Sequence, residues 1–412
     1  MRVTSIISEY NPFHEGHKYH MENTKKITNS DFVIVIMSGD FTQRGTPAII
    51  DKYARTKQAL LNGADLVLEL PVSFATASAE GFAIGAVSTL DKLSVVDSLV
   101  FGSECGDMNC IKKVADFLTD ESPEYREHLQ FYLKQGLSFP KARANVLEEF
   151  FPELEHDFLS SSNNILGIEY CRALNLFNSS ITPMTITRKD NLYNDEELAE
   201  VGKLSSATAI RKVLFEAAND FNSIKNHVPQ STFDNLKESW NLSTPIRSRD
   251  FSLLLKYRLL TENKISICEY LDITSDLADR IYNNFNNYKD FDSFCNLLKT
   301  KELTYTRIAR SLLHIILDIK KSDFDIIKIS GYGQYARILG FRKEASPLLR
   351  EIKDNSSIPL ISKLSDSVKE LDGVALSMLE KDIHTAHIYE SVVADKFNQE
   401  FKNEFQRQLV IM

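Results

Sequence analysis

The chain has 412 residues, 43% of them hydrophobic, and carries a formal net charge of −9. This length exceeds one typical domain core, so we expect two or more domains in a protein of ordinary globular composition. No apolar run reaches the roughly 20 residues of a membrane span, and the N-terminus enters a strand without a signal-peptide pattern, so we expect a cytoplasmic protein. The acidic total argues against a nucleic-acid binder, although a local basic face carries more weight than the total.

The N-terminal half alternates apolar strands with amphipathic helices. Strands are predicted over residues 2–8, 31–38, 65–70, 96–101 and 182–187, and helices over residues 16–26, 49–62 and 78–93. This order implies a parallel sheet with helices on both faces. Ligands of such sheets bind beyond the carboxyl ends of the strands, so the loops after Ser8, Ser38 and Phe101 are the candidate site.

The first of these loops, E-Y-N-P-F-H-E-G-H at residues 9–17, opens a helix and carries His14, Gly16 and His17. Glycine lets the backbone approach a phosphate, and the helix start offers unpaired N–H groups. Two imidazoles can donate hydrogen bonds to a phosphate that gains charge in a transition state. The loop therefore predicts phosphate chemistry; the alternative is a surface turn that happens to carry histidines.

The loop after the second strand carries three polar side chains that could face the same pocket. They are Asp40, Gln43 and Arg44. The glycines around them indicate a special turn. An ordinary polar loop is the alternative.

Three later positions fit the nucleoside and phosphates of a nucleotide. Gly102 ends the fourth strand, where a missing side chain lets an adenine or ribose lie against the backbone. Asn163 could fix the nucleoside, and Arg188 could clamp phosphates. A plain turn, a helix cap and a solvated charge are the respective alternatives.

Residues 205–211 begin a helix with hydroxyls and an arginine, which makes a second anion site possible. The candidates there are Ser206, Thr208 and Arg211. The alternative is a simple serine N-cap with the arginine in solvent.

After Pro245 the strand signals nearly vanish. Helices are predicted over residues 251–260, 265–270, 275–286, 291–298, 306–317 and 375–397, and residues 327–337 and 359–364 are less regular. We therefore expect a catalytic domain over residues 1–230 and a mainly helical domain over residues 231–412.

The second half interleaves aromatic residues with basic ones. Such a mixture suits RNA, because arginine binds phosphates and aromatic faces stack on bases. Solvated helix charges are the alternative. The candidates are Arg307, Arg310, Arg337, Arg342 and Lys343.

The sequence offers no complete set of metal ligands. His384 and His387 are too few, and the cysteines form no C-x-x-C pair. We therefore expect no metal site, and we expect the cysteines to be free thiols. The cysteines are Cys105, Cys110, Cys171, Cys268 and Cys295.

Taken together, these motifs resemble the bacterial tRNA(Met) cytidine acetate ligases, a family of the HxGH nucleotidyltransferase superfamily. The resemblance is carried by residues 6–17, 37–44, 65–71, 101–104, 163–167, 205–211, 303–310 and 331–347. It implies an α/β fold, in which a Rossmann-like parallel-sheet nucleotidyltransferase domain is followed by a mainly α-helical C-terminal domain that binds tRNA.

The resemblance also implies the activity. Such a ligase uses ATP and acetate to make acetyl-adenylate, releases pyrophosphate, and passes the acetyl group to N4 of the wobble cytidine of elongator tRNA(Met). The alternatives are a nucleotidyltransferase that adenylylates another small metabolite, and a non-catalytic RNA-binding protein that keeps a nucleotide-binding fold.

The family pattern implies that His14 and His17 are catalytic and that ATP also touches Gly102, Asn163 and Arg188. The neighbouring Asn164 leaves the choice of asparagine open, and Mg²⁺ is expected to bridge phosphate oxygens. The implied ATP-binding run consists of Ile7, Ser8, Glu9, Tyr10, Asn11, Pro12, Phe13, His14, Glu15, Gly16, His17, Lys18, Tyr19 and His20.

Overall fold

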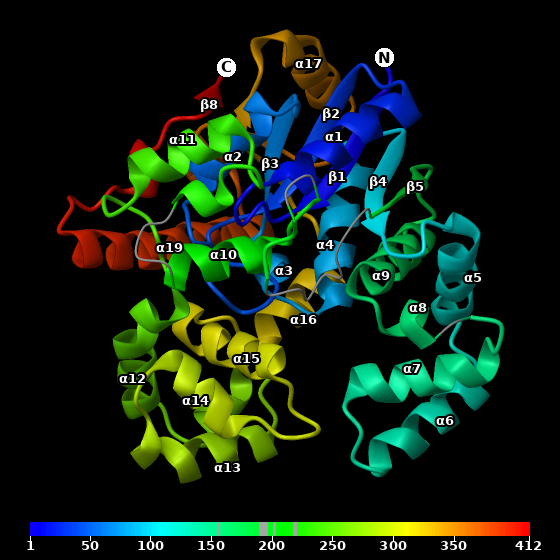
Figure 1. Ribbon diagram of the computed structural model, residues 1–412, viewed down its shortest axis with the longest axis vertical. Helices are drawn as coiled ribbons and strands as arrows, with labels where there is room; N and C mark the ends of the chain where they lie inside the picture. Colours follow the sequence, from blue (N-terminus) through cyan, green and yellow to red (C-terminus); the bar gives the residue numbers. More distant parts are fainter. Residues whose placement is uncertain (155, 189–196, 201–202, 217–220) are drawn as a thin grey trace.

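The computed structural model describes residues 1–154, 156–188, 197–200, 203–216 and 221–412. Within these residues eight strands form one sheet, in the order β5-β4-β1-β2-β3-β6-β7, with β8 paired to β6 (Figure 1). The strands are β1 (Val3–Ser8), β2 (Phe32–Ser38), β3 (Leu66–Leu70), β4 (Ser98–Ser103), β5 (Thr182–Thr187), β6 (Ala336–Phe341), β7 (Leu360–Ile361) and β8 (Val410–Ile411).

Strands β1 to β5 run parallel, as the alternating pattern predicts. Their carboxyl ends therefore meet at one edge of the sheet. Buried side chains of β2 alternate between the two faces: Ile34 and Ile36 join one apolar core, while Val33 and Val35 join another. The predicted α/β fold with helices on both faces is confirmed.

Helices cover both faces and extend the molecule beyond the sheet (Figure 1). In the described residues the α-helices are α1 (Glu15–Thr28), α2 (Lys52–Leu61), α3 (Val72–Ala75), α4 (Ala79–Lys92), α5 (Met108–Thr119), α6 (Pro123–Lys134), α7 (Phe139–Phe150), α8 (His156–Ser160), α9 (Ser162–Leu176), α10 (Ala207–Glu216), α11 (Gln230–Ser239), α12 (Ser252–Thr261), α13 (Ser275–Asn284), α14 (Phe291–Leu298), α15 (Tyr305–Leu317), α16 (Lys321–Ile329), α17 (Ser346–Asn355), α18 (Leu364–Glu370) and α19 (Gly373–Phe397).

Local sequence signals explain where these helices begin and end. The Asp51 carboxylate accepts hydrogen bonds from the Tyr53 and Ala54 backbone N–H groups and so caps α2. Helix α1 ends at Asn29, which adopts the left-handed conformation that asparagine tolerates.

The second half is mainly helical, as expected, but three of its strands belong to the sheet. Strand β6 pairs antiparallel with β3, and Arg337 lies directly opposite Glu69. The prediction that residues 327–337 are less regular is wrong at both ends, since residues 327–329 end α16 and residues 336 and 337 begin β6. The arginine in this buried strand hides the strand pattern until its carboxylate partner is known. The expected division at residue 230 stays a prediction about function.

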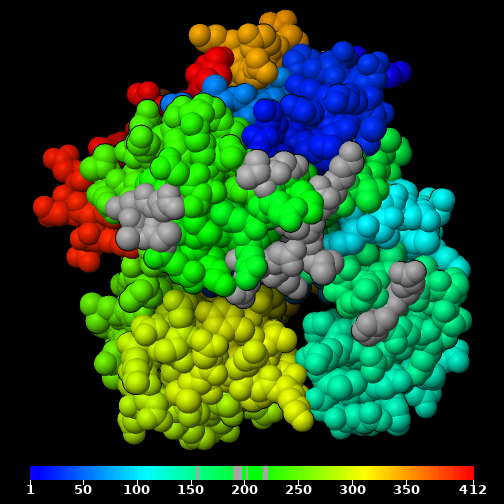
Figure 2. Space-filling model, viewed as in Figure 1, coloured from blue at the N-terminus to red at the C-terminus, as the bar shows by residue number. Residues whose placement is uncertain are grey.

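Two helical lobes project beyond the edge where the parallel strands end. Figure 2 shows them at the bottom of the molecule, with α12–α15 in yellow and green on one side, α6 and α7 in blue-green on the other, and a hollow between them. Helices α12–α15 share a core with Phe41 and Val72, so this lobe packs against the loop after β2 and the start of α3.

Candidate active site

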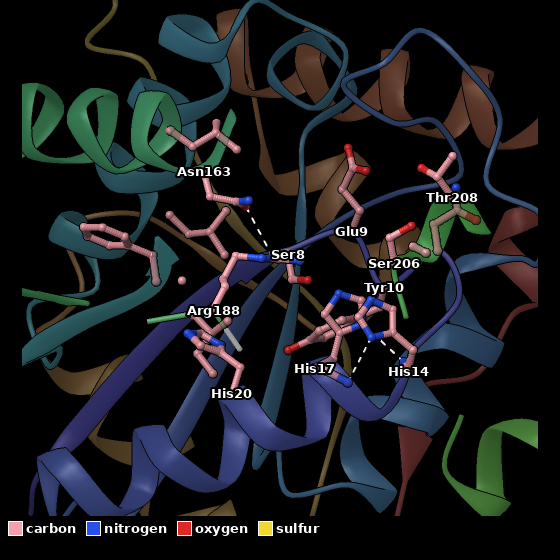
Figure 3. Close-up of a pocket in the computed structure, with 18 of the residues that line it drawn as sticks. Ser8, Glu9, Tyr10, His14, His17, His20, Asn163, Arg188, Ser206 and Thr208 are labelled. Carbon is pink, nitrogen blue, oxygen red and sulfur yellow. Dashed lines mark hydrogen bonds between the residues drawn. The ribbon is translucent and has the colours of Figure 1, made fainter. Parts of the chain in front are cut away.

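A cavity of about 200 Å³ opens at the carboxyl ends of β1, β4 and β5 (Figure 3). It brings together predicted residues from segments far apart in the sequence. These are Ile7, Ser8, Glu9, Tyr10, Asn11, His14, Gly16, His17, Tyr19, His20, Gln43, Arg44, Gly102, Asn163, Arg188, Ser206, Thr208 and Arg211.

The turn between β1 and α1 fixes both motif histidines through the backbone. The Gly16 N–H donates to Nδ1 of His14 (3.0 Å), and the His14 N–H donates to Nδ1 of His17 (3.3 Å). The two rings stack with centroids 3.6 Å apart. Because each Nδ1 accepts a hydrogen bond, a neutral ring carries its hydrogen on Nε2.

Gly16 is required by this arrangement. A Cβ at this position would lie 2.8 Å from Cε1 of the buried His14 ring, so a larger residue would displace the imidazole. The H-x-G-H spacing thus serves to place two N–H donors, and the glycine permits their packing.

Burial keeps these imidazoles neutral. It lowers the pKa of His14 to about 3, with further lowering by the positive charges of Arg188 and Arg211. Burial also lowers the pKa of His20 to about 4 and that of His17 well below its usual value. At neutral pH the rings act as hydrogen-bond donors, and the arginines supply the positive charge.

His20 is turned toward the same cavity from one turn further along α1. Its Nε2 is buried and has no hydrogen-bond partner among the described residues. A buried polar atom without a partner is costly, so a bound ligand would relieve this position.

The two neighbouring asparagines at the start of α9 have different tasks. Asn164 is 1% exposed, and its Oδ1 accepts hydrogen bonds from the backbone N–H groups of Glu104 and Cys105. Asn163 lines the cavity, and its Nδ2 donates to Oε1 of Glu104 (2.7 Å). Its Oδ1 is therefore left facing Arg188, at 3.5 Å from Nη1 (Figure 3).

Gly102 supports Arg188 as well as the cavity wall. A Cβ there would lie 3.3 Å from Cγ of Arg188, so the glycine leaves room for the arginine to pack over the end of β4. The Arg188 N–H donates to the Ser103 carbonyl (2.9 Å), which fixes the residue after β5.

The start of α10 forms the other polar wall. Ser206 caps the helix by accepting from the Ala209 N–H (3.0 Å), so the predicted serine cap is confirmed. Arg211 donates from Nη1 to the Asn11 carbonyl (2.7 Å) and from Nη2 to Oγ1 of Thr208 (3.2 Å). Arg211 is thus fixed to the histidine loop, and the alternative of an arginine in solvent is wrong.

Some predicted residues do not line the cavity. Asp40 is 7% exposed and accepts from the Lys52 N–H (2.8 Å), so it supports α2; burial raises its pKa to about 7, against the effect of Lys52. Its predicted place in the pocket is wrong. Four members of the implied ATP-binding run are also outside the lining: Pro12, Phe13, Glu15 and Lys18.

One RNA-binding candidate is contradicted. Arg337 is 3% exposed, with Nη1 at 2.8 Å from Oε2 of Glu69 and Nη2 at 2.6 Å from Oε1 of Glu404. A surface role for Arg337 is wrong, because a guanidinium with two buried carboxylate partners cannot reach an RNA phosphate.

The other RNA-binding candidates lie nearer to solvent. Arg310 is paired with Asp272 at 3.1 Å, Arg307 and Arg342 are half-buried, and Lys343 is exposed. Their role stays a prediction.

Ser205 belongs to the predicted segment 205–211, but its contact could not be predicted from the sequence. It is buried, and its hydroxyl lies 2.8 Å from Nδ1 of His227, further along the chain. The remaining additions are mostly apolar or small residues that any fold could use: Ile6, Thr42, Thr46, Phe82, Phe101, Leu166, Tyr170, Ile186, Thr187, Leu204 and Ala207.

The described residues contain neither a membrane-spanning helix nor a cluster of metal ligands. No helix there has the length and apolar character to cross a membrane. No group of three or more histidine, cysteine or acidic side chains there is arranged to hold a metal ion.

Comparison with known proteins places this geometry in a family. The family model described as HIGH Nucleotidyl Transferase matches residues 1–404. A tRNA(Met) cytidine acetate ligase of Clostridium perfringens is 42% identical over 398 residues, which cover 94% of this chain and 95% of the relative. One from Acetivibrio thermocellus is 39% identical over 417 residues, covering 100% of both chains.

Solved structures agree with this result. The apo crystal structure of Thermotoga maritima TmcAL has a TM-score of 0.93 at 31% identity, and the form bound with alpha-thio ATP has a TM-score of 0.91 at 31% identity. Both alignments cover 100% of each chain. The chain therefore belongs to the HIGH nucleotidyl transferases and, among them, to the tRNA(Met) cytidine acetate ligase family.

Proposed function

We propose that this protein is an ATP-dependent tRNA(Met) cytidine acetate ligase. The observation that carries the proposal is the pair of neutral, backbone-oriented imidazoles of His14 and His17 in a cavity that also holds Arg188 and Arg211. Donors and positive charge fixed in this way suit the binding of ATP phosphates and the stabilisation of charge on them. The relatives named above carry the same activity in their names over almost the whole chain.

In the first half-reaction an acetate oxygen attacks the α-phosphorus of ATP, and pyrophosphate leaves with the bonding electrons. No protein nucleophile is needed, so the enzyme's part is positioning and charge stabilisation. We assign the Nε2–H groups of His14 and His17 to the α-phosphate oxygens. Mg²⁺ bound to ATP would supply further positive charge against the phosphates.

The base and sugar of ATP belong on the β4–β5 side of the cavity. Gly102, Asn163 and Arg188 lie there, and the bond from Asn163 Nδ2 to Glu104 turns the Oδ1 of Asn163 toward Arg188 and the cavity. We therefore assign the nucleotide contact to Asn163, with Asn164 as its support.

In the second half-reaction the wobble cytidine of tRNA(Met) attacks the acetyl carbon of acetyl-adenylate. The base must leave the anticodon stack to reach the cavity. The helical lobe α12–α15 shares a core with Phe41, which precedes the lining residue Thr42, so we assign tRNA contact to this lobe, with Arg307 as the leading candidate.

The proposal is tested by acetate-dependent exchange of labelled pyrophosphate into ATP, together with mass analysis of nucleosides from tRNA(Met) treated with protein, ATP and acetate. Both exchange and N4-acetylcytidine are expected. Exchange that ignores acetate but responds to another acid would favour a different adenylylating enzyme.

A substitution of His14 tests the role given to the histidines. His14→Ala should reduce exchange by about 100-fold or more, because it removes an oriented donor. His128→Ala is the matched control, since His128 is an exposed histidine paired with Glu149 outside the cavity. Equal exchange in the two variants would exclude the role given to His14.

A further inference from the structure

Glu9 stands out among the residues around the cavity. Among the described lining residues it is the one carboxylate, whereas arginine occurs at three positions: Arg44, Arg188 and Arg211. The family resemblance counts Glu9 in the ATP-binding run, but ATP phosphates and acetate are anions, and a carboxylate repels both. The position therefore calls for a different substrate group.

The carboxylate lies on the side of the cavity away from the proposed nucleotide contacts. Glu9 follows β1, which is flanked by β4 on one side and by β2 on the other. Its Oε1 accepts from the backbone N–H of Gln43 (2.8 Å), in the loop after β2. Figure 3 shows its side chain on the opposite side of the end of β1 from the imidazoles of His14 and His17.

One carboxylate oxygen remains available. The interactions of Glu9 in the described residues engage Oε1, and Oε2 has no hydrogen-bond partner there. The residue is half-buried, so this oxygen keeps access to the cavity.

The loop after β2, whose Gln43 N–H binds Glu9, also touches the helical lobe. Gly45 has φ of +74°, and a Cβ on it would lie 2.3 Å from the backbone nitrogen of Arg310 in α15. Arg307 lies one turn earlier on the same helix. Glu9 therefore sits on the wall shared with the lobe to which tRNA is assigned.

We propose that Glu9 recognises the exocyclic amine of the acceptor cytosine and takes its proton during acetyl transfer. The inference rests on the ligase function proposed above. Carboxylates accept hydrogen bonds from the N4 amine of cytosine, whereas uracil offers a carbonyl oxygen there and would be repelled. The residue thus contributes both to the choice of base and to the reaction.

The N4 lone pair forms a C–N bond to the acetyl carbonyl carbon, and the bond between that carbon and the phosphate oxygen breaks, so AMP leaves with the electron pair. The amine loses one proton to Oε2 of Glu9. Since the lone pair of this amine is conjugated with the ring, hydrogen bonding to a carboxylate increases its reactivity.

Glu9→Gln tests the inference, because glutamine keeps an oxygen for the Gln43 N–H and loses the base. Acetyl transfer to tRNA(Met), measured in a single turnover from preformed acetyl-adenylate, should fall by about 100-fold or more. Acetate-dependent pyrophosphate exchange should fall far less. Glu9→Asp, which keeps a carboxylate, should transfer faster than Glu9→Gln.

Glu22→Gln is the matched control, since Glu22 is exposed on α1 outside the cavity lining and loses the same charge. Loss of exchange and transfer to the same extent in Glu9→Gln would overturn the inference, and so would recovery of both by excess Mg²⁺, which would make Glu9 a metal ligand. Absence of exchange in the unaltered protein would instead contradict the proposed function.

Discussion

At the level of single residues, hydrogen bonds from neighbouring residues fix the orientation of the side chains that line the cavity. Glu104 is such a support: Oε1 accepts from the Asn163 backbone N–H (3.3 Å) and from its Nδ2, while Oε2 accepts from the Asn164 N–H (2.9 Å). Sequence alone could not separate the two asparagines. Consecutive helical residues point about 100° apart, and only the neighbours show which direction is the cavity.

Glu104→Gln should weaken ATP binding. The new NH₂ group must face one of three donors, and losing a hydrogen bond to a charged group costs about 1.5–3 kcal/mol, so KM for ATP should rise roughly tenfold or more. The exchange rate at saturating ATP should change less. Glu153→Gln, in an exposed pair with Lys113, is the control; an unaltered KM would show that Asn163 needs no such support.

The buried neutral histidines should make the free energy of unfolding depend on pH. Burial, followed by the charge of Arg188, lowers the pKa of His20 from 6.5 to about 4, so the unfolded chain binds a proton in this range that the folded protein does not. The free energy of unfolding should therefore decrease as the pH falls from about 6.5 to about 4.5. His20→Gln should lessen this decrease in urea unfolding experiments, and identical slopes would contradict neutral burial.

At the level of elements, local periodicity predicts most of the parallel sheet and its helices, because each signal lies within one segment. Strand β5 was predicted with its observed bounds, and the helix predicted at residues 306–317 is α15. Strand β6 was missed because it buries Arg337. The carboxylates that pair with this arginine, Glu69 and Glu404, lie far from it in sequence. The RNA-like appearance of Arg337 was misleading for the same reason.

The start of α2 depends on the same buried charges. Nζ of Lys52 lies 2.8 Å from Oε1 of Glu69 and 2.6 Å from Oε1 of Glu404, and Lys52 is 1% exposed. Lys52→Met should lower the free energy of unfolding by about 3–5 kcal/mol, because it leaves Arg337 as the one cation, among the described residues, against these two buried carboxylates. Lys57→Met, at an exposed position of α2, should stay within about 0.5 kcal/mol. Equal urea midpoints would contradict the network.

For the whole molecule, the sheet is completed from both halves of the chain. The chain leaves the sheet after β5, builds the lobe α12–α15, and returns as β6 beside β3. Helix α19 then packs against α3 and α15, which joins the lobe to the catalytic sheet. The functional division expected at residue 230 is therefore compatible with one cooperative structure, in which the lobe that we propose as the tRNA-binding part packs against the loop after β2.

A fragment of residues 1–230 tests this organisation. It would lack Arg337 and Glu404, leave Glu69 and Lys52 without these partners, and expose β3 as a sheet edge. Unpaired buried charges and a bare apolar edge both favour unfolding and aggregation. We expect the fragment to lack a cooperative urea transition and to bind no ATP, while the full chain shows both. A cooperative transition in the fragment would instead make the nucleotide-binding part an independent folding unit, and the charge network around Lys52 would then be an accessory to the fold.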